Sequence, residues 1–135
     1  MTGVFVDSFY FIALLNPDDQ FHEAAKHATR SIAVPLVTTG WVLVEVADAL
    51  SAPGFRMHAH RFLLRLASDR NTRVVAADGT WYGRGLALYA ARHDKSWSLT
   101  DCISFEVMAE FGLVEALTGD HHFEQAGYRA LLARS

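Results

Sequence analysis

The sequence predicts an α/β protein in which helices cover both faces of a central parallel sheet. Short apolar runs of strand type alternate with helical patterns from one end of the chain to the other, and this alternation is typical of a parallel sheet. No internal repeat, low-complexity tract or linker interrupts it. Because 135 residues are a usual length for one domain, we expect a single domain over residues 1–135.

The first expected strand covers residues 3–6, which are β-branched and aromatic without polar alternation, as in buried strands of parallel sheets. Asp7 follows at once, and a helical pattern runs over residues 8–14. An acid before a helix is a common N-cap. It also lies at the carboxyl end of a strand, where open α/β sheets hold their ligands. Asp7 alone does not decide between these roles.

The remaining elements continue the alternation. Further strands are expected at residues 35–38, 72–76, 115–118 and 128–132, the last at an edge of the sheet. Helices are expected near residues 19–31, 41–50, 55–68, 80–91 and 98–111. Thr38 or Thr39 caps the second of these helices and Gly112 ends the last. In the helix at 80–91 we place Leu86, Tyr89 and Ala90 on the buried side.

The composition indicates a soluble protein of the cytoplasm. Twelve Lys and Arg against fifteen Asp and Glu give a formal net charge of −3, which argues against a protein that coats nucleic acid by charge alone. No apolar run approaches the ~18 residues of a membrane-spanning helix, so we expect no membrane partner. The single cysteine, Cys102, excludes an internal disulfide and is interpreted as a small buried apolar side chain.

Four acidic residues recur where strands give way to helices. Asp7 and Asp120 follow expected strands, whereas Glu45 and Asp101 lie in the first turns of expected helices. In a doubly wound sheet these places all face the carboxyl edge. Helix capping is the alternative for each acid, and Ser98 and Asp101 have the spacing of a capping box.

Four carboxylates in one groove repel one another unless divalent cations bind them. Ligands that are all oxygen favour Mg²⁺ or Mn²⁺ over Zn²⁺, and such a site suits phosphoryl transfer or hydrolysis. Asp48 lies one helical turn after Glu45 on the same face. It is either a supporting partner of Glu45 or an exposed helix acid, and we favour the second.

The acids stand within four short motifs: Val-Phe-Val-Asp-Ser at residues 4–8, Val-Leu-Val-Glu-Val at 42–46, Ser-Leu-Thr-Asp-Cys at 98–102 and Leu-Thr-Gly-Asp-His-His-Phe at 117–123. Together, in this order and at this spacing, they resemble PIN-domain ribonucleases, and most closely VapC-type toxins of toxin–antitoxin operons. The resemblance spans nearly the whole chain. It implies a PIN-like three-layer α/β/α sandwich with a mainly parallel sheet, and an endoribonuclease that depends on one or two Mg²⁺ or Mn²⁺ ions.

Carried over by position, the resemblance makes Asp7, Asp101 and Asp120 metal ligands, with Glu45 completing an acidic quartet. The hydroxyls of Thr100 and Thr118 would orient the carboxylates. Asp48 stands where relatives often have a neutral amide, and it would add negative charge near the site. The resemblance also implies an RNA substrate, a homodimer and a small antitoxin whose C-terminal segment occupies the groove.

The same residues argue against two other functions. A haloacid-dehalogenase-like phosphatase needs a second Asp two residues after the first, where this chain has Phe9; a receiver domain needs a Lys at the end of a late strand, and neither Lys26 nor Lys95 is so placed. A non-catalytic PIN-fold module that binds RNA or protein stays open, as does a housekeeping ribonuclease without an antitoxin. Specificity for RNA needs basic side chains. Five residues are candidates for contacting the RNA, and the sequence does not choose among them: Arg56, Arg61, Arg65, Arg92 and Lys95.

Overall fold

A parallel sheet forms the middle of the fold, as expected. The computed structural model describes residues 2–132, and in that range the sheet has five strands in the order β3-β2-β1-β4-β5, with every neighbouring pair parallel. The strands are β1 (Val4–Val6), β2 (Leu36–Thr39), β3 (Thr72–Val75), β4 (Glu115–Leu117) and β5 (Arg129–Ala130). The three residues of central β1 are buried, and the last strand lies at an edge.

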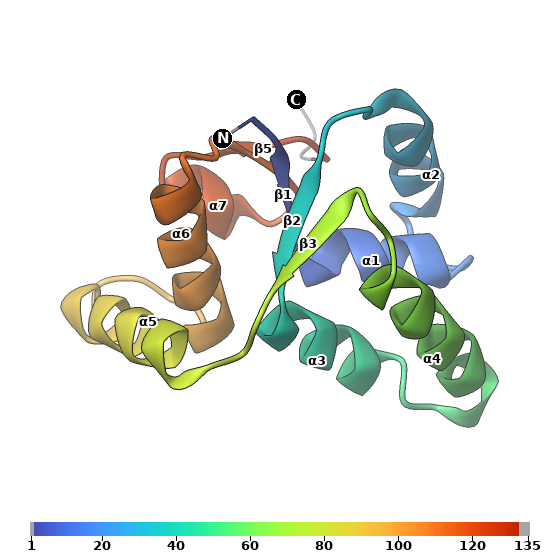
Figure 1. The fold of residues 1–135 in the computed structure, drawn as a ribbon, viewed down its shortest axis with the longest axis horizontal. Coiled ribbons are helices and arrows are strands. Elements are labelled where there is room, and N and C mark those ends of the chain that lie inside the picture. The colour runs from blue at the N-terminus through green and yellow to red at the C-terminus, as the bar shows by residue number, and fades with distance from the viewer. Residues whose placement is uncertain (1, 133–135) are drawn as a thin grey trace.

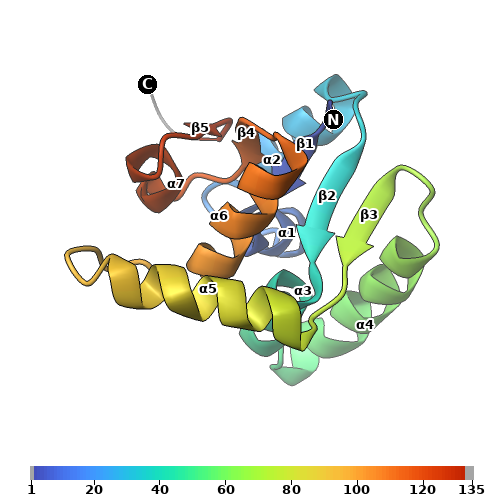
Figure 2. The same cartoon turned by 60° about the vertical axis from the view of Figure 1, so that its left-hand side comes forward.

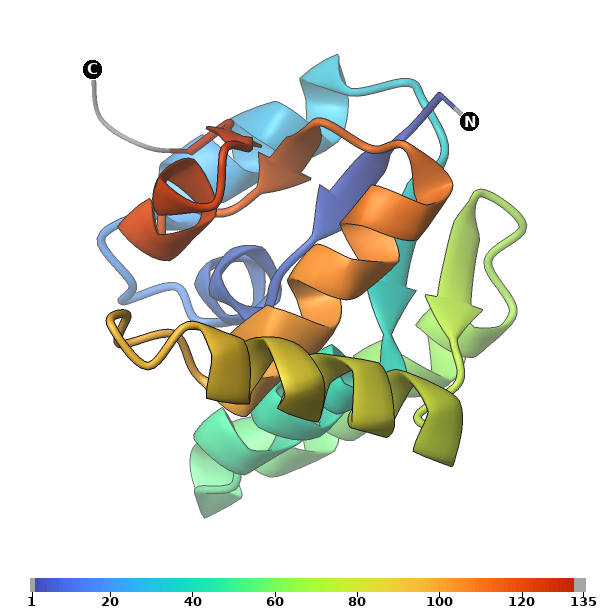
Figure 3. The same ribbon diagram turned by 90° about the vertical axis from the view of Figure 1, so that its left-hand side faces the viewer.

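Helices cover the sheet on both sides. They are α1 (Ser8–Leu15), α2 (His22–Ser31), α3 (Gly40–Ala49), α4 (Pro53–Ala67), α5 (Gly79–Ala91), α6 (Leu99–Phe111) and the short α7 (His121–Gln125), which was not expected. Figures 1 and 3 show α5, α6 and α7 on one side of the sheet, and Figure 1 shows α1 to α4 on the other. None of the helices in residues 2–132 is long and apolar enough to cross a membrane.

The loops that follow the strands position the ends of the helices at one edge. Figure 2 shows α3 and α5 at the edge toward which the β2 and β3 arrows point. Thr39 is the cap of α3, since its hydroxyl accepts a hydrogen bond from the Val42 amide at 3.2 Å. Thr38 instead donates to the Val6 carbonyl at 2.8 Å and ties β2 to β1. The carboxyl edge is therefore held together by side chains as well as by strand pairing.

The expected burial of α5 is wrong. Leu86, Tyr89 and Ala90 are exposed, and the helix packs on α6 through the buried Gly85 instead. A Cβ atom at Gly85 would collide with the side chain of Ile103 and lie 3.1 Å from its Cα. Because the helices approach along this glycine, Leu86 and Tyr89 are left facing outward, while Trp81 and Leu88 of the same helix are half-buried against the core.

Candidate functional site

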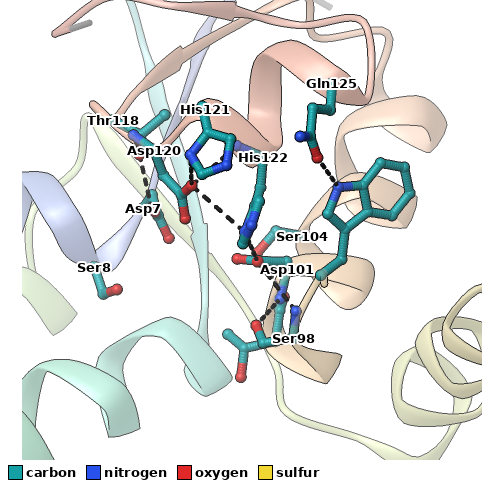
Figure 4. A network of polar contacts seen from close by, with 12 residues as sticks. Asp7, Ser8, Ser98, Asp101, Ser104, Thr118, Asp120, His121, His122 and Gln125 are labelled. Atoms are coloured by element: carbon teal, nitrogen blue, oxygen red, sulfur yellow. Dashed lines mark hydrogen bonds and ion pairs between the residues drawn. The ribbon is translucent and has the colours of Figure 1, made fainter. Parts of the chain in front are cut away.

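The acids singled out in the sequence come from four different elements and meet at the carboxyl edge of the sheet. Asp7 directly follows β1, Asp120 lies between β4 and α7, Asp101 is in the first turn of α6, and Glu45 is in α3. Figure 4 shows the side chains of Asp7, Asp101 and Asp120 around one space. Glu45 is near enough to Asp101 and Asp120 for their charges to raise its pKa.

Asp7 is the most deeply buried of the four. Its Oδ2 accepts a hydrogen bond of 2.9 Å from the Thr118 hydroxyl, and a hydrogen bond from the Ser8 backbone also favours the charged form of the carboxyl. Burial raises the pKa of Asp7 from its ordinary 3.8 to about 7, and the charges of Asp101 and Glu45 act in the same direction, while the bond from Thr118 opposes them. Without a cation, this carboxyl tends to hold a proton.

Asp101 serves the helix and the cluster at once. The Ser98 hydroxyl accepts from the Asp101 amide at 3.0 Å, and Asp101 Oδ2 accepts from the Ser98 amide at 3.2 Å, so the capping box is present. Burial raises the pKa of Asp101, as does the charge of Asp120, whereas the cap and His122 lower it. Capping and participation in the cluster are therefore not alternatives for this residue.

Glu45 is half-buried and accepts a hydrogen bond of 3.0 Å from the Ser8 hydroxyl. Burial raises its pKa, and so do the charges of Asp101, Asp120 and Asp48. No role was expected for Ser8. Because it follows Asp7 directly, one strand end supplies both an acid and the hydroxyl that holds a second acid of the cluster.

His122 was also missed. Its Nδ1 lies 3.1 Å from Asp101 Oδ2 and 3.5 Å from Asp120 Oδ1, so the imidazole bridges two of the acids (Figure 4). Asp120 caps α7 by accepting from the His122 amide at 2.9 Å, and His121 Nδ1 lies 3.6 Å from the same carboxylate. Asp120, His121 and His122 present ligand atoms within 4.8 Å of one another. The sequence feature that could have indicated this role is the pair of histidines directly after Asp120.

Three further residues were considered as supports of the acids, and they differ in how they interact with the cluster. Thr118 contacts the cluster twice, since it donates to Asp7 and its oxygen accepts from the Asp120 amide at 3.1 Å. Thr100 uses its backbone carbonyl, which accepts from Ser104 at 2.9 Å; within residues 2–132 its hydroxyl donates to none of the four carboxylates. Asp48 is exposed and reaches Glu45 through its charge.

The donor set fits a divalent cation. In the part of the chain that the structure describes, the Lys and Arg side chains that form ion pairs do so with other acids, and none of them pairs with the quartet. Within residues 2–132, His121 and His122 are the only side chains able to carry a positive charge that lie within ion-pairing distance of these acids. Buried carboxylates that repel one another without a Lys or Arg partner are stabilised when a metal ion binds them.

The chain is similar over most of its length to the 23S rRNA-specific endonuclease VapC20 of Mycobacterium tuberculosis. The two are 30% identical over 130 residues, which cover 93% of this chain and 95% of the relative. The crystal structure of that protein, described as a sarcin–ricin loop cleaving toxin, superposes with a TM-score of 0.85 at 25% identity, over 93% of this chain and 95% of the other. No model of a known protein family matches the chain.

Two more distant structures share the fold. A toxin–antitoxin complex from Klebsiella pneumoniae has a TM-score of 0.61 and 17% identity, over 87% of each chain. FitAcB from Neisseria gonorrhoeae has a TM-score of 0.64 and 16% identity, over 94% of each chain. At these identities the likeness concerns the architecture alone.

Proposed function

The chain belongs to the VapC-like PIN-domain toxins, and on that premise we propose that it is a metal-dependent endoribonuclease acting at its acidic cluster. The observation that carries the proposal is the convergence of Asp7, Glu45, Asp101 and Asp120, drawn from four elements, without a Lys or Arg partner in residues 2–132. In a chain 30% identical to an rRNA endonuclease, such a cluster suits hydrolysis of phosphodiester bonds.

We propose that Asp7, Asp101 and Asp120 hold one or two Mg²⁺ or Mn²⁺ ions, with Glu45 completing the set. A divalent cation held by these residues would lower the pKa of an attacking water and would offset the negative charge on the leaving oxygen. The protein's own contribution is orientation: Thr118 fixes Oδ2 of Asp7, and the Ser98 amide fixes Oδ2 of Asp101. His122 holds Asp101 and Asp120 at a set separation through one ring nitrogen.

The substrate we propose is an exposed loop of 23S rRNA. The relative is named for 23S rRNA and, in its crystal structure, for cleavage of the sarcin–ricin loop. Single-stranded loops suit an enzyme of negative net charge, because their bases and phosphates can be splayed into a groove and bound to a few side chains and metal ions. A non-catalytic RNA- or protein-binding module is the alternative, and the presence of all four acids counts against it.

Purified protein freed of any antitoxin is expected to cut a transcript that contains the sarcin–ricin loop when Mg²⁺ or Mn²⁺ is present. Cutting should stop in EDTA and return when the metal is restored in excess, because the carboxylates cannot bring a phosphate close without a cation. Electrophoresis of end-labelled RNA measures this, with an unstructured RNA of equal length as the comparison. Undiminished cleavage in EDTA would refute the metal-dependent mechanism, and binding without cleavage would favour the non-catalytic module.

We further propose that the protein is a homodimer neutralised by a small antitoxin, acting in the cytoplasm. The dimer contact we propose is the α5 surface, which we define as Tyr82 and Leu86 with the neighbouring Trp41. Tyr82 and Leu86 are 42% and 43% exposed, and the Trp41 and Tyr82 rings lie 6.1 Å apart between centroids. Trp41 Nε1 is buried without a hydrogen-bond partner in residues 2–132. A short reading frame directly upstream of the gene would favour an antitoxin over a housekeeping role.

Leu86→Arg is expected to convert the dimer to a monomer, because a charge in the centre of an apolar contact is desolvated without a partner. Light scattering coupled to gel filtration measures the mass. Leu64→Arg on α4, at a side chain 60% exposed, is the matched control and should remain dimeric. A parent protein that is monomeric at all concentrations would rule out the homodimer.

A further inference from the structure

A large cavity lies beside the acidic cluster, between the end of α5 and the start of α6. Its volume is about 910 Å³, which is in the range of small-molecule sites. Lining residues that matter for its chemistry are Tyr89, Arg92, His93, Lys95, Trp97 and Ser98. We call it the α5–α6 cavity. None of the four acids of the cluster lines it.

The charged side chains of this cavity are basic, in a chain whose net charge is −3. Arg92 is engaged, since its guanidinium binds both oxygens of Asp94 at 3.0 and 3.1 Å. The Lys95 ammonium makes no ion pair in residues 2–132 and lies 6.0 Å from the centroid of the Trp97 ring. Lys95 is therefore the cation that an anionic group entering the cavity would meet.

Two aromatic rings line the cavity and have different roles. Trp97 is buried, donates its indole N–H to Gln125 at 3.0 Å and packs against Phe105. Its role is therefore to support the wall of the cavity. Tyr89 is 51% exposed. Tyr89 and Lys95 line the same cavity, and an exposed ring together with a cation is an arrangement with which proteins bind single-stranded nucleic acid, because a base can stack on the ring while a phosphate meets the charge.

The wall of the cavity is continuous with the acidic cluster. Ser98 lines the cavity, and its amide donates to the same Asp101 oxygen that His122 contacts. An RNA strand whose phosphate lies at the carboxylates can therefore place a neighbouring nucleotide in the cavity. The remaining basic candidates, Arg56, Arg61 and Arg65, lie on α4, across the sheet from α5 and α6 (Figure 1).

We propose that the α5–α6 cavity receives a nucleotide of the RNA substrate next to the phosphate that is cut, with Lys95 contacting a phosphate oxygen and Tyr89 stacking on the base. This inference rests on the ribonuclease function proposed above. Lys95 is one of the five basic candidates from the sequence. Tyr89 is an aromatic residue that the charge pattern did not indicate.

The test measures binding apart from cleavage. A fluorescein-labelled RNA hairpin with the sarcin–ricin loop is titrated in Mg²⁺ with Asp7→Asn protein, which should bind without cutting, and anisotropy is read at several salt concentrations. Lys95→Gln in this background should weaken binding and reduce the slope of log K against log salt by about 0.7, the value for one phosphate contact to a single strand. Tyr89→Ala should weaken binding about tenfold with the slope unchanged.

Matched variants separate these effects from general damage. Tyr89→Phe keeps the ring and should bind like the background protein, and Lys26→Gln, which removes the only other lysine, should leave both affinity and slope unchanged. Light scattering and thermal unfolding confirm that each variant keeps its mass and fold. If Lys95→Gln and Tyr89→Ala bind with unchanged affinity and slope while the native chain still cuts the hairpin, the cavity assignment is wrong and the ribonuclease function stands. Equal losses in Tyr89→Phe and Tyr89→Ala would exclude stacking. If the native chain neither binds nor cuts RNA, both proposals fail.

Discussion

Asp101→Asn is expected to lower the rate of RNA cleavage by on the order of 10³-fold or more while leaving the fold intact. The carboxylate contacts the cap of α6 and His122 and interacts with Asp120, Asp7 and Glu45 through its charge. Asparagine has nearly the same shape, and its carbonyl oxygen can still accept the Ser98 amide, so the helix start is kept. The lost negative charge weakens the attraction for a divalent cation. Single-turnover cleavage of labelled RNA measures the rate.

Asp18→Asn is the control for that substitution. Asp18 lies in the exposed turn after α1, its charge is not among those that raise the pKa of Asp7, Glu45 or Asp101, and its neutralisation changes the net charge equally. It should cut at the parental rate. If Asp101→Asn protein, shown to be free of contaminating nuclease, cuts as fast as the parent, then the assignment of the acidic cluster is wrong.

The metal-free protein is expected to lose stability as pH rises from 5 to 8. Folding raises the pKa of Asp7 from 3.8 to about 7, so between these values the folded chain binds more protons than the unfolded chain. Its free energy of unfolding therefore falls with rising pH and levels off above the folded pKa. A shift of about three pKa units corresponds to roughly 4 kcal/mol, which is an upper bound because the neighbouring acids titrate together. Urea unfolding in EDTA at several pH values measures the slope.

Asp7→Asn tests the origin of this pH dependence. An amide can still accept the Thr118 hydroxyl bond but does not ionise, so the variant should be more stable than the parent at pH 8 in EDTA. Mg²⁺ should stabilise the parent at pH 8 by binding the folded state alone, and should stabilise the variant less. An identical pH dependence in parent and variant would place the titrating group elsewhere.

Local chemistry decided which parts of the fold could be predicted. The start of α6 was predictable because Ser98 and Asp101 form a capping box within four residues, and β1 was predictable because every position in it is apolar and buried. The buried side of α5 was not. Hydrophobic spacing placed Leu86 inside, but the close approach of Gly85 to Ile103 depends on the partner helix, which spacing within one helix cannot reveal.

The convergence of the four acids was predicted from the sequence, whereas two of their contacts, with Ser8 and His122, were not. Asp7 and Asp120 stand at ends of strands, and topology brings such ends together whatever the side chains do. The Ser8–Glu45 bond spans 37 positions and the His122–Asp101 contact spans 21. Each depends on how far one helix is rotated against another. That rotation is set by the packing of the helices, so it cannot be predicted from the spacing of residues along the chain.

The bond from Thr118 to Asp7 joins positions 111 residues apart, and this separation bears on when the protein becomes active during its synthesis. Ribosomes make chains from the N-terminus, so Asp7 is made long before Thr118 and Asp120. A nascent or truncated chain that stops before residue 118 lacks two of the groups around Asp7. Under the proposed function, cleavage of RNA therefore requires translation beyond residue 120, and a product that stops earlier should be inactive.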